Sequence, residues 1–404
     1  MKLKEFAIIN MGQSPKGETY NTVERGMPFL QGRKTFGRIY PSIDTWTTNP
    51  IKIANKSEIL MSVRAPVGDM NFANQEICIG RGLCSINAKN GRNKYLYYIL
   101  LNSMNDIKQK STGTVFDSVN RNDLENLEFN FHSEKEQDKI ENILGNIDIK
   151  IELNNEINNN LQELINNIFI SKFVNYYGYT GEYETTEIGD IPSNWKVDNL
   201  GNVISFSNGY GWNSKDMLEN NQPDTYKVFK MGNIKIGGGI NKEKTRSWIL
   251  KEKCSGLEQF LSKKGDILMC MTDMKSSENP LLGHTALIDC DDEFVINQRV
   301  GIIRCDKDIR WPYIYTMTNL PFFINNIRSK AHSGVQVNLT TSGICDTKVL
   351  IPDKDSLEEF YKNVTPMYEE MFILNNEIEK LKELRDTLLP KLMNSEINLD
   401  NVEI

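Results

Sequence analysis

The sequence has no long apolar run, few histidines and no paired cysteines, and each of these absences excludes a class of protein. No stretch of about 18 apolar residues occurs, so we expect no membrane-spanning helix. Glu5 and Asn10 interrupt the apolar residues near the start, which therefore lack the pattern of a signal peptide. Seven scattered cysteines without a Cys-x-x-Cys pair argue against a disulfide framework and a zinc finger. We therefore expect a soluble, cytoplasmic protein with no membrane partner.

Sequence motifs for catalysis or cofactor binding are also missing. The histidines His132, His284 and His332 lie far apart, without acidic or cysteine neighbours at metal-ligand spacing. No Gly-x-Gly-x-x-Gly or P-loop pattern occurs, and the glycine run 237–239 is typical of a turn. The run 279–282 lacks the second proline and the aromatic residue of the Asn-Pro-Pro-aromatic motif of amino-methyltransferases. The sequence therefore predicts no catalytic residue, no metal site and no cofactor.

The net charge of −7 hides an alternation along the chain. Residues 1–132 and 195–352 carry net charges of +5 and +3. Residues 133–180 and 181–194 each carry −4, and residues 353–404 carry −7. The basic segments suit a nucleic-acid partner, whereas the acidic segments suit proteins.

Short matches recur in the same order along the chain and indicate a tandem duplication. The pentapeptide 153–157 recurs letter for letter at 374–378, an offset of 221 residues. Three further matches join Gly113 with Gly334, Leu3 and Gly12 with Leu200 and Gly209, and the run 58–61 with the run 266–269. The offset grows along the chain, as expected if the second copy contains loop insertions.

Two regular apolar patterns predict long helices, one in each copy. The first, from Glu134 to about Lys172, is interrupted by Asn154 and Asn158 and contains Ile140, Leu144, Ile147, Ile151, Leu161, Ile165 and Ile168. The second contains Met367, Met371, Leu374, Ile378, Leu381 and Leu388. Because one helix cannot bury such a stripe alone, we expect the two helices to pack as an antiparallel coiled coil.

These patterns predict an α+β fold with a pseudo-two-fold tandem duplication, in which each globular domain is followed by a long helix. The expected segments are a first globular domain (1–132), a central helical spacer (133–180), a linker (181–194), a second globular domain (195–352) and a distal helical spacer (353–404).

Polar and basic residues follow short apolar runs at the turns of both globular domains. Arginine can bind guanine, glutamine and asparagine can bind adenine, and lysine, serine and threonine can hold phosphates. The DNA-binding candidates of the first domain are Gln31, Arg33, Lys34, Arg64, Arg81, Lys110, Ser111, Thr112 and Thr114. Those of the second are Lys230, Asn233, Thr272, Lys275, Arg299 and Ser333. The alternative is that they are ordinary solvated loop residues and that Arg64 forms a structural ion pair with Asp69.

The residues of the first domain resemble a target recognition domain of the DNA-specificity (S) subunits of type I restriction–modification systems. The runs that carry this resemblance are 12–15, 28–32, 59–69 and 78–83. The segment 134–154 is similar to the central helical region of that family, and the resemblance extends over the whole chain. The second domain departs from the pattern, because 271–275 differs from the Val-Arg-Ala-Pro run of the first and the distal helix lacks the Glu-Gln start.

The resemblance implies a non-catalytic subunit that reads a bipartite double-stranded DNA target with its two globular domains. The paired helices would set the spacer and dock two methyltransferase subunits, and restriction–translocase subunits would join through the complex. The acidic candidates for partner binding are Glu152, Glu156, Glu377 and Glu379. The alternatives are a coiled-coil scaffold whose globular domains bind proteins, and a stand-alone DNA methyltransferase.

Overall fold

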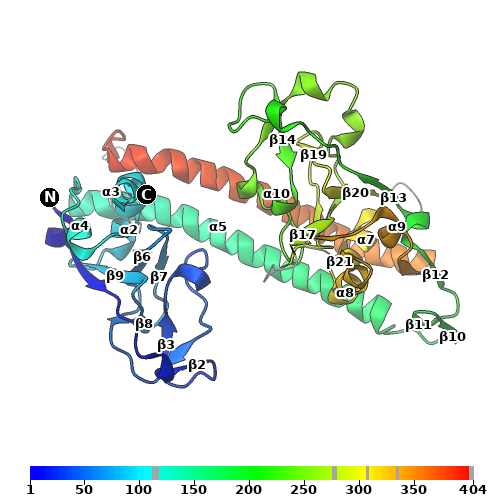
Figure 1. The fold of residues 1–404 in the computed structure, drawn as a ribbon, viewed down its shortest axis with the longest axis horizontal. Helices are drawn as coiled ribbons and strands as arrows, with labels where there is room; N and C mark the ends of the chain where they lie inside the picture. The colour runs from blue at the N-terminus through cyan, green and yellow to red at the C-terminus, as the bar shows by residue number, and fades with distance from the viewer. Residues whose placement is uncertain (112–117, 275–279, 306–308, 334–335, 400–404) are drawn as a thin grey trace. The chain divides into compact units, whose positions relative to one another are not determined.

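The computed structural model describes residues 1–111, 118–274, 280–305, 309–333 and 336–399 (Figure 1). The chain divides into unit 1, Met1–Leu153 with Glu377–Ile404, and unit 2, Asn154–Asn376. Each unit contains a globular lobe and one half of each of two long helices, α5 (Glu134–Phe169) and α10 (Lys354–Met393). We call residues 1–133 lobe 1 and residues 175–353 lobe 2. Among the described residues, no helix has the length and apolarity needed to span a bilayer.

Lobe 1 contains two sheets and short helices. The main sheet has the order β1-β9-β6-β7, from Ala7–Met11, Leu83–Ala88, Ile59–Ser62 and Met70–Phe72. The second sheet has the order β2-β4-β3-β8-β5, from Tyr20–Asn21, Trp46–Thr47, Met27–Leu30, Ile77–Ile79 and Ile53–Ala54. The helices are α1 (Leu3–Phe6), α2 (Asn93–Asn102), α3 (Met104–Ser111) and α4 (Arg121–Glu125), with 3-10 turns η1 (Gly17–Thr19) and η2 (Arg33–Thr35).

Lobe 2 has the same plan with additional strands. Its main sheet has the order β13-β20-β16-β18, from Ser205–Asn208, Val300–Arg304, Ile267–Cys270 and Thr285–Leu287. Two three-stranded sheets are β15-β14-β19 (Trp248–Leu250, Thr225–Phe229, Phe294–Ile296) and β17-β22-β21 (Thr272–Met274, Gln336–Asn338, His332–Ser333). The pairs are β10-β11 (Tyr183–Thr186, Gly189–Pro192) and β12-β23 (Lys196–Asn199, Lys348–Ile351).

The helices of lobe 2 are α6 (Leu200–Val203), α7 (Trp311–Thr318), α8 (Pro321–Ser329) and α9 (Thr341–Cys345). A π-helical turn, η3 (Ile170–Val174), follows α5. The 3-10 turns are η4 (Ser214–Asp216), η5 (Met231–Asn233), η6 (Lys242–Lys244), η7 (Lys251–Cys254) and η8 (Glu258–Phe260).

The apolar run shared by the two copies forms the central strand of each main sheet. On β6, Leu60 packs toward the second sheet, whereas Ile59 and Met61 pack toward the helices. On β16, Leu268 likewise packs toward the β15-β14-β19 sheet of lobe 2. Because successive side chains of a strand point to opposite faces, a strand buried on both faces needs a continuous apolar run. This requirement explains why the match between 58–61 and 266–269 survives at the centre of both lobes.

The order of elements confirms the predicted duplication at the level of the fold. Both main sheets place the last long strand between the first strand and the strand with the repeated apolar run. The helix that opens each copy begins at Leu3 and at Leu200, and the last short helix begins at Arg121 and at Thr341. The offset therefore grows along the chain, because lobe 2 contains insertions such as the turns η6 and η7 between its strands.

The two long helices are antiparallel within each unit, as predicted. In unit 1, α5 is joined to α10 by an ion pair between Lys150 Nζ and Glu377 Oε2 at 3.5 Å. In unit 2, Asn158 Nδ2 donates to Asn375 Oδ1 at 3.1 Å. Lys172 also forms an ion pair with Glu359 in unit 2. In each unit, the half of α5 is paired with the opposite half of α10.

The apolar stripe of α5 is buried by the lobes as well as by α10. Ile140 and Leu144 join the core of lobe 1 together with Leu389 of α10. Phe169 joins the core of lobe 2 together with Phe360 of α10. The prediction that the helices cover each other is therefore incomplete, because each lobe packs over its end of the helix pair.

The repeated pentapeptide does not occupy equivalent positions in the two helices. Leu153 is 49% exposed, whereas Leu374 is 5% exposed. The helices begin at Glu134 and Lys354, and this offset makes Leu374 equivalent to Asn154, which is also buried. A shift of one residue turns a helical side chain by about 100° around the axis. The letter match is therefore displaced by one residue from the structural repeat.

The segment expected as a linker, 181–194, contains the hairpin β10–β11. Thr185 Oγ1 donates to Asp190 Oδ1 across the hairpin at 2.7 Å. Just after it, Trp195 Nε1 donates to Asp353 Oδ2, which also accepts the Ser356 hydroxyl at the start of α10. This segment is therefore tied to the beginning of α10.

Candidate nucleic-acid interface

Three turns of lobe 1 meet where β1, β3 and β8 end and β9 begins, and we call residues 12–15, 31–34 and 80–82 the three-turn cluster. The backbone of Gly12 passes so close to the Gly80 turn that a Cβ atom on Gly12 would lie 2.1 Å from the Gly80 carbonyl oxygen. Only glycine permits this approach without displacing the backbone. The cluster is thus defined by packing of the main chain, independently of its exposed side chains.

Ser14 joins the three turns of the cluster. Its hydroxyl donates to Gln31 Oε1 at 2.9 Å and accepts the backbone N–H of Arg81 at 3.2 Å. The side chains of Gln31 and Arg81 are exposed. The structure therefore brings together two predicted DNA-binding residues and adds Ser14, which sequence reasoning did not single out as a site residue.

Arg33 and Lys34 lie on η2, directly after the Gln31 turn, and both are exposed. Arg33 forms an ion pair with Asp69, and both side chains remain accessible to water. Arg64 is also exposed, and its backbone forms an isolated bridge with Ser118. The proposed structural pair between Arg64 and Asp69 is therefore wrong, because Asp69 pairs with Arg33 instead.

Several candidates cannot be placed on this surface. Thr112, Thr114 and Lys275 lie outside the described residues, as do Gly113 and Gly334 of the sequence repeat. Lys110 and Ser111 end α3, and Ser333 ends β21, but only the backbone is described there.

Lobe 2 contains an equivalent three-turn cluster, formed by residues 209–212, 230–233 and 297–299. A Cβ atom on Gly209 would lie 2.4 Å from the Asn297 carbonyl oxygen, as at Gly12 in lobe 1. The Gly209 N–H donates to the Val300 carbonyl oxygen at 2.9 Å, and the equivalent Gly12 N–H donates to the Leu83 carbonyl oxygen at the same distance. The two lobes therefore share the same local backbone.

The exposed side chains differ between the two clusters. Gly211 stands where lobe 1 has Ser14, and a Cβ atom on Gly211 would lie 2.8 Å from Gln298 Oε1. Gln298 in turn stands where lobe 1 has Arg81, and Arg299 is exposed beside it. Tyr210 takes the place of Gln13. Sequence reasoning missed Tyr210 and Gln298, although aligning the lobes through Gly12 and Gly209 would have found Tyr210.

Two predicted residues of lobe 2 are corrected by their burial. Asn233 is 1% exposed, and its side-chain amide donates to the Asn241 carbonyl oxygen and Thr245 Oγ1, both at 3.1 Å. Thr272 is buried, and its hydroxyl donates to Asn338 Oδ1 at 2.8 Å. Both side chains are structural, because their hydrogen-bonding groups are used inside the lobe.

Lys230 lies at the cluster but is half-buried, and its ammonium donates to Ser247 Oγ at 2.7 Å. The predicted turn 237–239 is confirmed, because its three glycines have φ values of 81°, 110° and 95°. The Gly237 N–H donates to His284 Nδ1 at 3.2 Å. Burial lowers the pKa of His284 to about 4, so the ring is neutral at pH 7 and accepts this bond.

The acidic residues predicted to bind a partner are mostly used within the chain. Glu152 pairs with Arg38 at 2.8 Å, Glu377 with Lys150 at 3.5 Å and Glu379 with Lys382 at 3.2 Å. Glu156 is exposed. The helices also expose large apolar side chains: Ile149, Leu153 and Leu384 in unit 1, and Ile157, Leu164 and Ile373 in unit 2.

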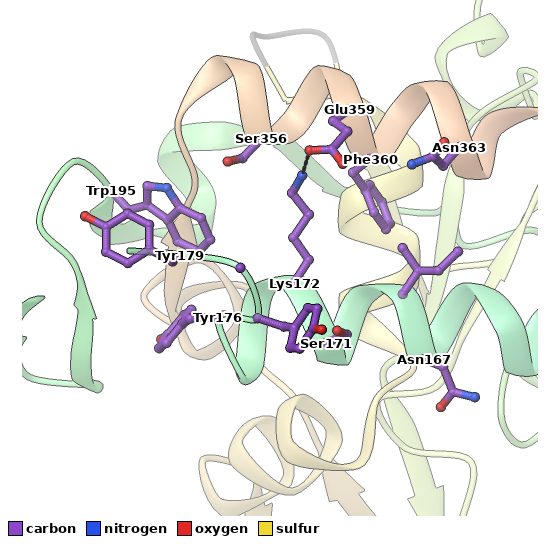
Figure 2. A pocket seen from close by; sticks show the side chains of 13 residues that line it. Asn167, Ser171, Lys172, Tyr176, Tyr179, Trp195, Ser356, Glu359, Phe360 and Asn363 are labelled. Atoms are coloured by element: carbon purple, nitrogen blue, oxygen red, sulfur yellow. Dashed lines mark hydrogen bonds and ion pairs between the residues drawn. The ribbon is translucent and has the colours of Figure 1, made fainter. Parts of the chain in front are cut away.

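Figure 2 shows a hollow of about 650 Å³ in unit 2, where the end of α5 meets the start of α10. Tyr176, Tyr179 and Trp195 form its aromatic wall, and the Lys172–Glu359 ion pair crosses it. The ring centroids of Tyr176 and Trp195 are 5.6 Å apart. Its thirteen lining residues include no histidine or cysteine.

One group of side chains among the described residues has the spacing of metal ligands: Asp289, Cys290 and Glu293. The Lys242 ammonium already lies 2.8 Å from Glu293 Oε2 and 3.9 Å from Asp289 Oδ1. Burial, with the neighbouring carboxylates, raises the pKa of Cys290 to about 12, so its thiol is not a thiolate at pH 7. A metal ion would have to displace the lysine, and this group does not fit one.

Comparisons with known proteins agree with the sequence resemblance. Residues 1–163 match the type I restriction modification DNA specificity domain. The chain is 41% identical over 147 residues to the MjaX specificity subunit of Methanocaldococcus jannaschii, covering 36% of this chain and 34% of that relative. It is 24% identical over 366 residues to the type I restriction enzyme MjaIX specificity subunit of the same organism, covering 87% and 80% of the two chains.

Thus the chain spans about a third of the length of the MjaX relative but most of the MjaIX relative. Among solved structures, the S subunit of a type I restriction–modification system from M. genitalium matches with a TM-score of 0.59 and 17% identity. This match covers 97% of this chain and 95% of that chain. At this identity it supports the fold alone.

Proposed function

We propose that this chain, whose residues 1–163 match the type I restriction modification DNA specificity domain, acts as a specificity subunit that recognises a bipartite double-stranded DNA target, one half-site per lobe. The observation that carries the proposal is the three-turn cluster, which both lobes build from the same backbone. The two clusters present different exposed side chains at equivalent positions. One surface that occurs twice with different polar groups is what recognition of two different half-sites requires.

The chemistry of lobe 1 suits direct readout of bases. Arg81 offers the paired donors that bind guanine, and Gln31 offers the donor and acceptor that bind adenine. Ser14 holds both turns, and Arg33, Lys34 and Arg64 supply positive charge around them. In lobe 2, Gln298 stands at the position of Arg81, and the exposed side chains of Tyr210 and Arg299 lie beside it.

We propose that two methyltransferase subunits dock on the long helices and that restriction–translocase subunits join through this complex. The support for this part of the proposal is apolar exposure: Ile149 and Leu153 on unit 1, and Ile373 on unit 2, are large side chains open to solvent. The aromatic hollow of Figure 2 suits an anchor side chain from a partner, because tyrosine and tryptophan concentrate binding energy at protein interfaces. The chain itself needs no cofactor for this role.

The test uses the chain assembled with its methyltransferase subunits. Arg81→Ala should relax one base position of one half-site, at a cost of about 1–3 kcal/mol in binding of the optimal duplex. The matched control is Arg121→Ala, which removes an exposed arginine of lobe 1 that pairs with Glu125 on α4. Binding competition with singly substituted duplexes measures both. Equal effects of the two variants on every duplex would contradict the proposal, and an assembled complex that binds no DNA would favour the scaffold alternative.

A further inference from the structure

Arg38 lies in the loop between β3 and β4, five residues after Arg33, and its side chain reaches α5. Arg38 Nη1 lies 2.8 Å from Glu152 Oε2, and Nη2 lies 4.0 Å from Asp148 Oδ1. All of these residues belong to unit 1. The loop that presents Gln31 and Arg33 is thus tied to the helix pair by one guanidinium.

Asp148 is the centre of a larger network in unit 1. Its Oδ1 lies 3.1 Å from Arg385 Nη1 of α10, and its Oδ2 accepts the Tyr98 hydroxyl of α2 at 2.8 Å. Burial, with the charge of Asp148, raises the pKa of Tyr98, so this hydroxyl remains a donor. One carboxylate therefore joins lobe 1, α5 and α10.

On the other side, Arg38 lies between two residues that are fixed to β7. The Gly37 N–H donates to Asn71 Oδ1 at 3.0 Å, and Asn71 Nδ2 donates back to the Gly37 carbonyl oxygen at 2.9 Å. The Phe72 N–H donates to the Ile39 carbonyl oxygen at 2.7 Å. The backbone on both sides of Arg38 is therefore fixed to β7, and the Arg38 guanidinium connects this fixed part of lobe 1 to α5.

Unit 2 fixes its lobe to the helices in a different way. When α5 and α10 are aligned from their first residues, Glu134 and Lys354, Tyr368 is equivalent to Asp148 and Phe372 is equivalent to Glu152. Trp311 of lobe 2 packs on both rings, at centroid distances of 5.3 and 6.1 Å. At these equivalent helix positions, the contact between lobe and helix is therefore aromatic in unit 2 and ionic in unit 1.

The ionic network is accessible to water. Arg38, Asp148 and Arg385 line a cavity of about 350 Å³ in unit 1. Ion pairs that water and salt can reach are weakened by screening, whereas buried aromatic contacts are not. These two equivalent contacts should therefore respond differently to ionic strength.

We propose that Arg38 is a positioning residue for recognition of the first half-site, and that its network with Glu152, Asp148 and Arg385 holds the Gln31–Arg33 turn in register with the helix pair. This inference rests on the proposed function. It adds a residue that contacts no base and yet sets discrimination at one half-site. Because Asp148 lies on α5 and Arg385 on α10, whatever moves these helices also moves the turn.

The experiment uses the chain assembled with its methyltransferase subunits. Three duplexes are compared: the recognised sequence, one substituted in the half-site read by lobe 1, and one substituted in the other. Arg38→Gln should lower discrimination at the first half-site by about two- to thirtyfold and leave the second unchanged. Arg38→Lys should restore part of it, because an ammonium can pair with one carboxylate but lacks the planar fork.

The matched control is Arg92→Gln. Arg92 also joins lobe 1 to α5, through an ion pair with Asp138, but it lies at the start of α2 and not on the reading loop. Glu152→Gln is a second test that keeps the shape of the side chain. In the unmodified complex, raising salt from about 0.05 to about 0.3 M should reduce discrimination at the first half-site more than at the second.

Equal losses for Arg38→Gln and Arg92→Gln, or weaker binding of all three duplexes alike, would overturn the proposal. So would unchanged discrimination in both Arg38→Gln and Glu152→Gln. Should Arg38→Gln fail to assemble, Glu152→Gln decides between the same outcomes. An unmodified complex that does not discriminate among the duplexes would instead contradict the proposed function itself.

Discussion

Lobe 1 and lobe 2 share a backbone fold but differ in their side chains, both at the three-turn cluster and where each lobe contacts the helix pair. At the three-turn cluster, Gly12 and Gly209 permit the same close approach, while Arg81 and Gln298 stand in equivalent places. At the helix pair, lobe 1 is tethered through Asp148 and lobe 2 through Tyr368. The comparison teaches that main-chain packing defines the surface, and that the side chains placed on it are independently variable.

The difference between the tethers gives the largest expected effect. Tyr368 is 1% exposed, and Tyr368→Ala should lower the free energy of unfolding by about 3–5 kcal/mol, independently of salt. Asp148→Asn removes a charge from an accessible network and should cost about 1–3 kcal/mol, less at high salt. Urea denaturation at low and high ionic strength measures both. A salt-sensitive loss at Tyr368, or a salt-insensitive loss at Asp148, would break the comparison.

The shared backbone is tested at its two glycines. Gly12→Ala and Gly209→Ala each place a Cβ atom against a carbonyl oxygen and should destabilise the chain by about 1–3 kcal/mol. Gly17→Ala in lobe 1 and Gly232→Ala in lobe 2 are the controls, because nothing lies within 4 Å of a Cβ atom at either position. Thermal unfolding compares each variant with its control. Equal stabilities within a pair would show that the close approach is not required.

Acid should lower the stability of the chain through His284, which lies in unit 2. Its pKa is about 4 in the folded chain and about 6.5 when unfolded, so at pH 5 the unfolded state binds a proton that the folded state does not. The contribution of neutral His284 to the free energy of unfolding is complete above pH 6.5. It is lost progressively as the pH falls toward 4, by about 1–2 kcal/mol at pH 5. Chemical denaturation at pH 7 and pH 5 should show a smaller loss for His284→Gln than for the unmodified chain. An identical pH dependence would refute this assignment.

The smallest expected effect is a gain in stability. Gly145 lies inside α5 and lines the cavity of unit 1, and nothing lies within 4 Å of a Cβ atom built there. Gly145→Ala should therefore stabilise the helix by about 0.5–1 kcal/mol. Gly201→Ala is the opposite case, because its Cβ atom would lie 2.8 Å from Cys345 Cβ. In thermal unfolding, the melting temperature of Gly145→Ala should be higher than that of the unmodified chain, and that of Gly201→Ala should be lower.

The duplication was predictable from short matches that recur in the same order, and the long helices were predictable from local periodicity. Their pairing followed because neither helix can bury its apolar stripe alone. The spacing of Ile140, Leu144 and Ile151 predicts a buried helix face from sequence neighbours alone. The repeated pentapeptide gave an alignment of the two helices that is wrong by one residue, because identical residues need not be equally buried. Leu374 is buried, whereas Leu153 is exposed.

The candidate site was predictable only where a residue follows a strand. Gln31, Arg33 and Arg81 were found in this way, whereas Ser14 was missed because its two partners are 17 and 67 residues away. The partner of Glu152 lies 114 residues away, so nothing near it in the sequence predicts the ion pair. Asparagine is a residue type that can bind adenine, but Asn233 is buried and its amide already donates hydrogen bonds inside lobe 2.

The most direct test of the central account is methylation mapping with two equivalent variants. Arg81→Ala and Gln298→Ala are each assembled with the methyltransferase subunits, and the modified sequence is determined across a genome. If each lobe reads one half-site through its three-turn cluster, Arg81→Ala relaxes a position in one half-site and Gln298→Ala relaxes a position in the other. Changes by both variants in the same half-site, or no change by either with assembly intact, would contradict the account.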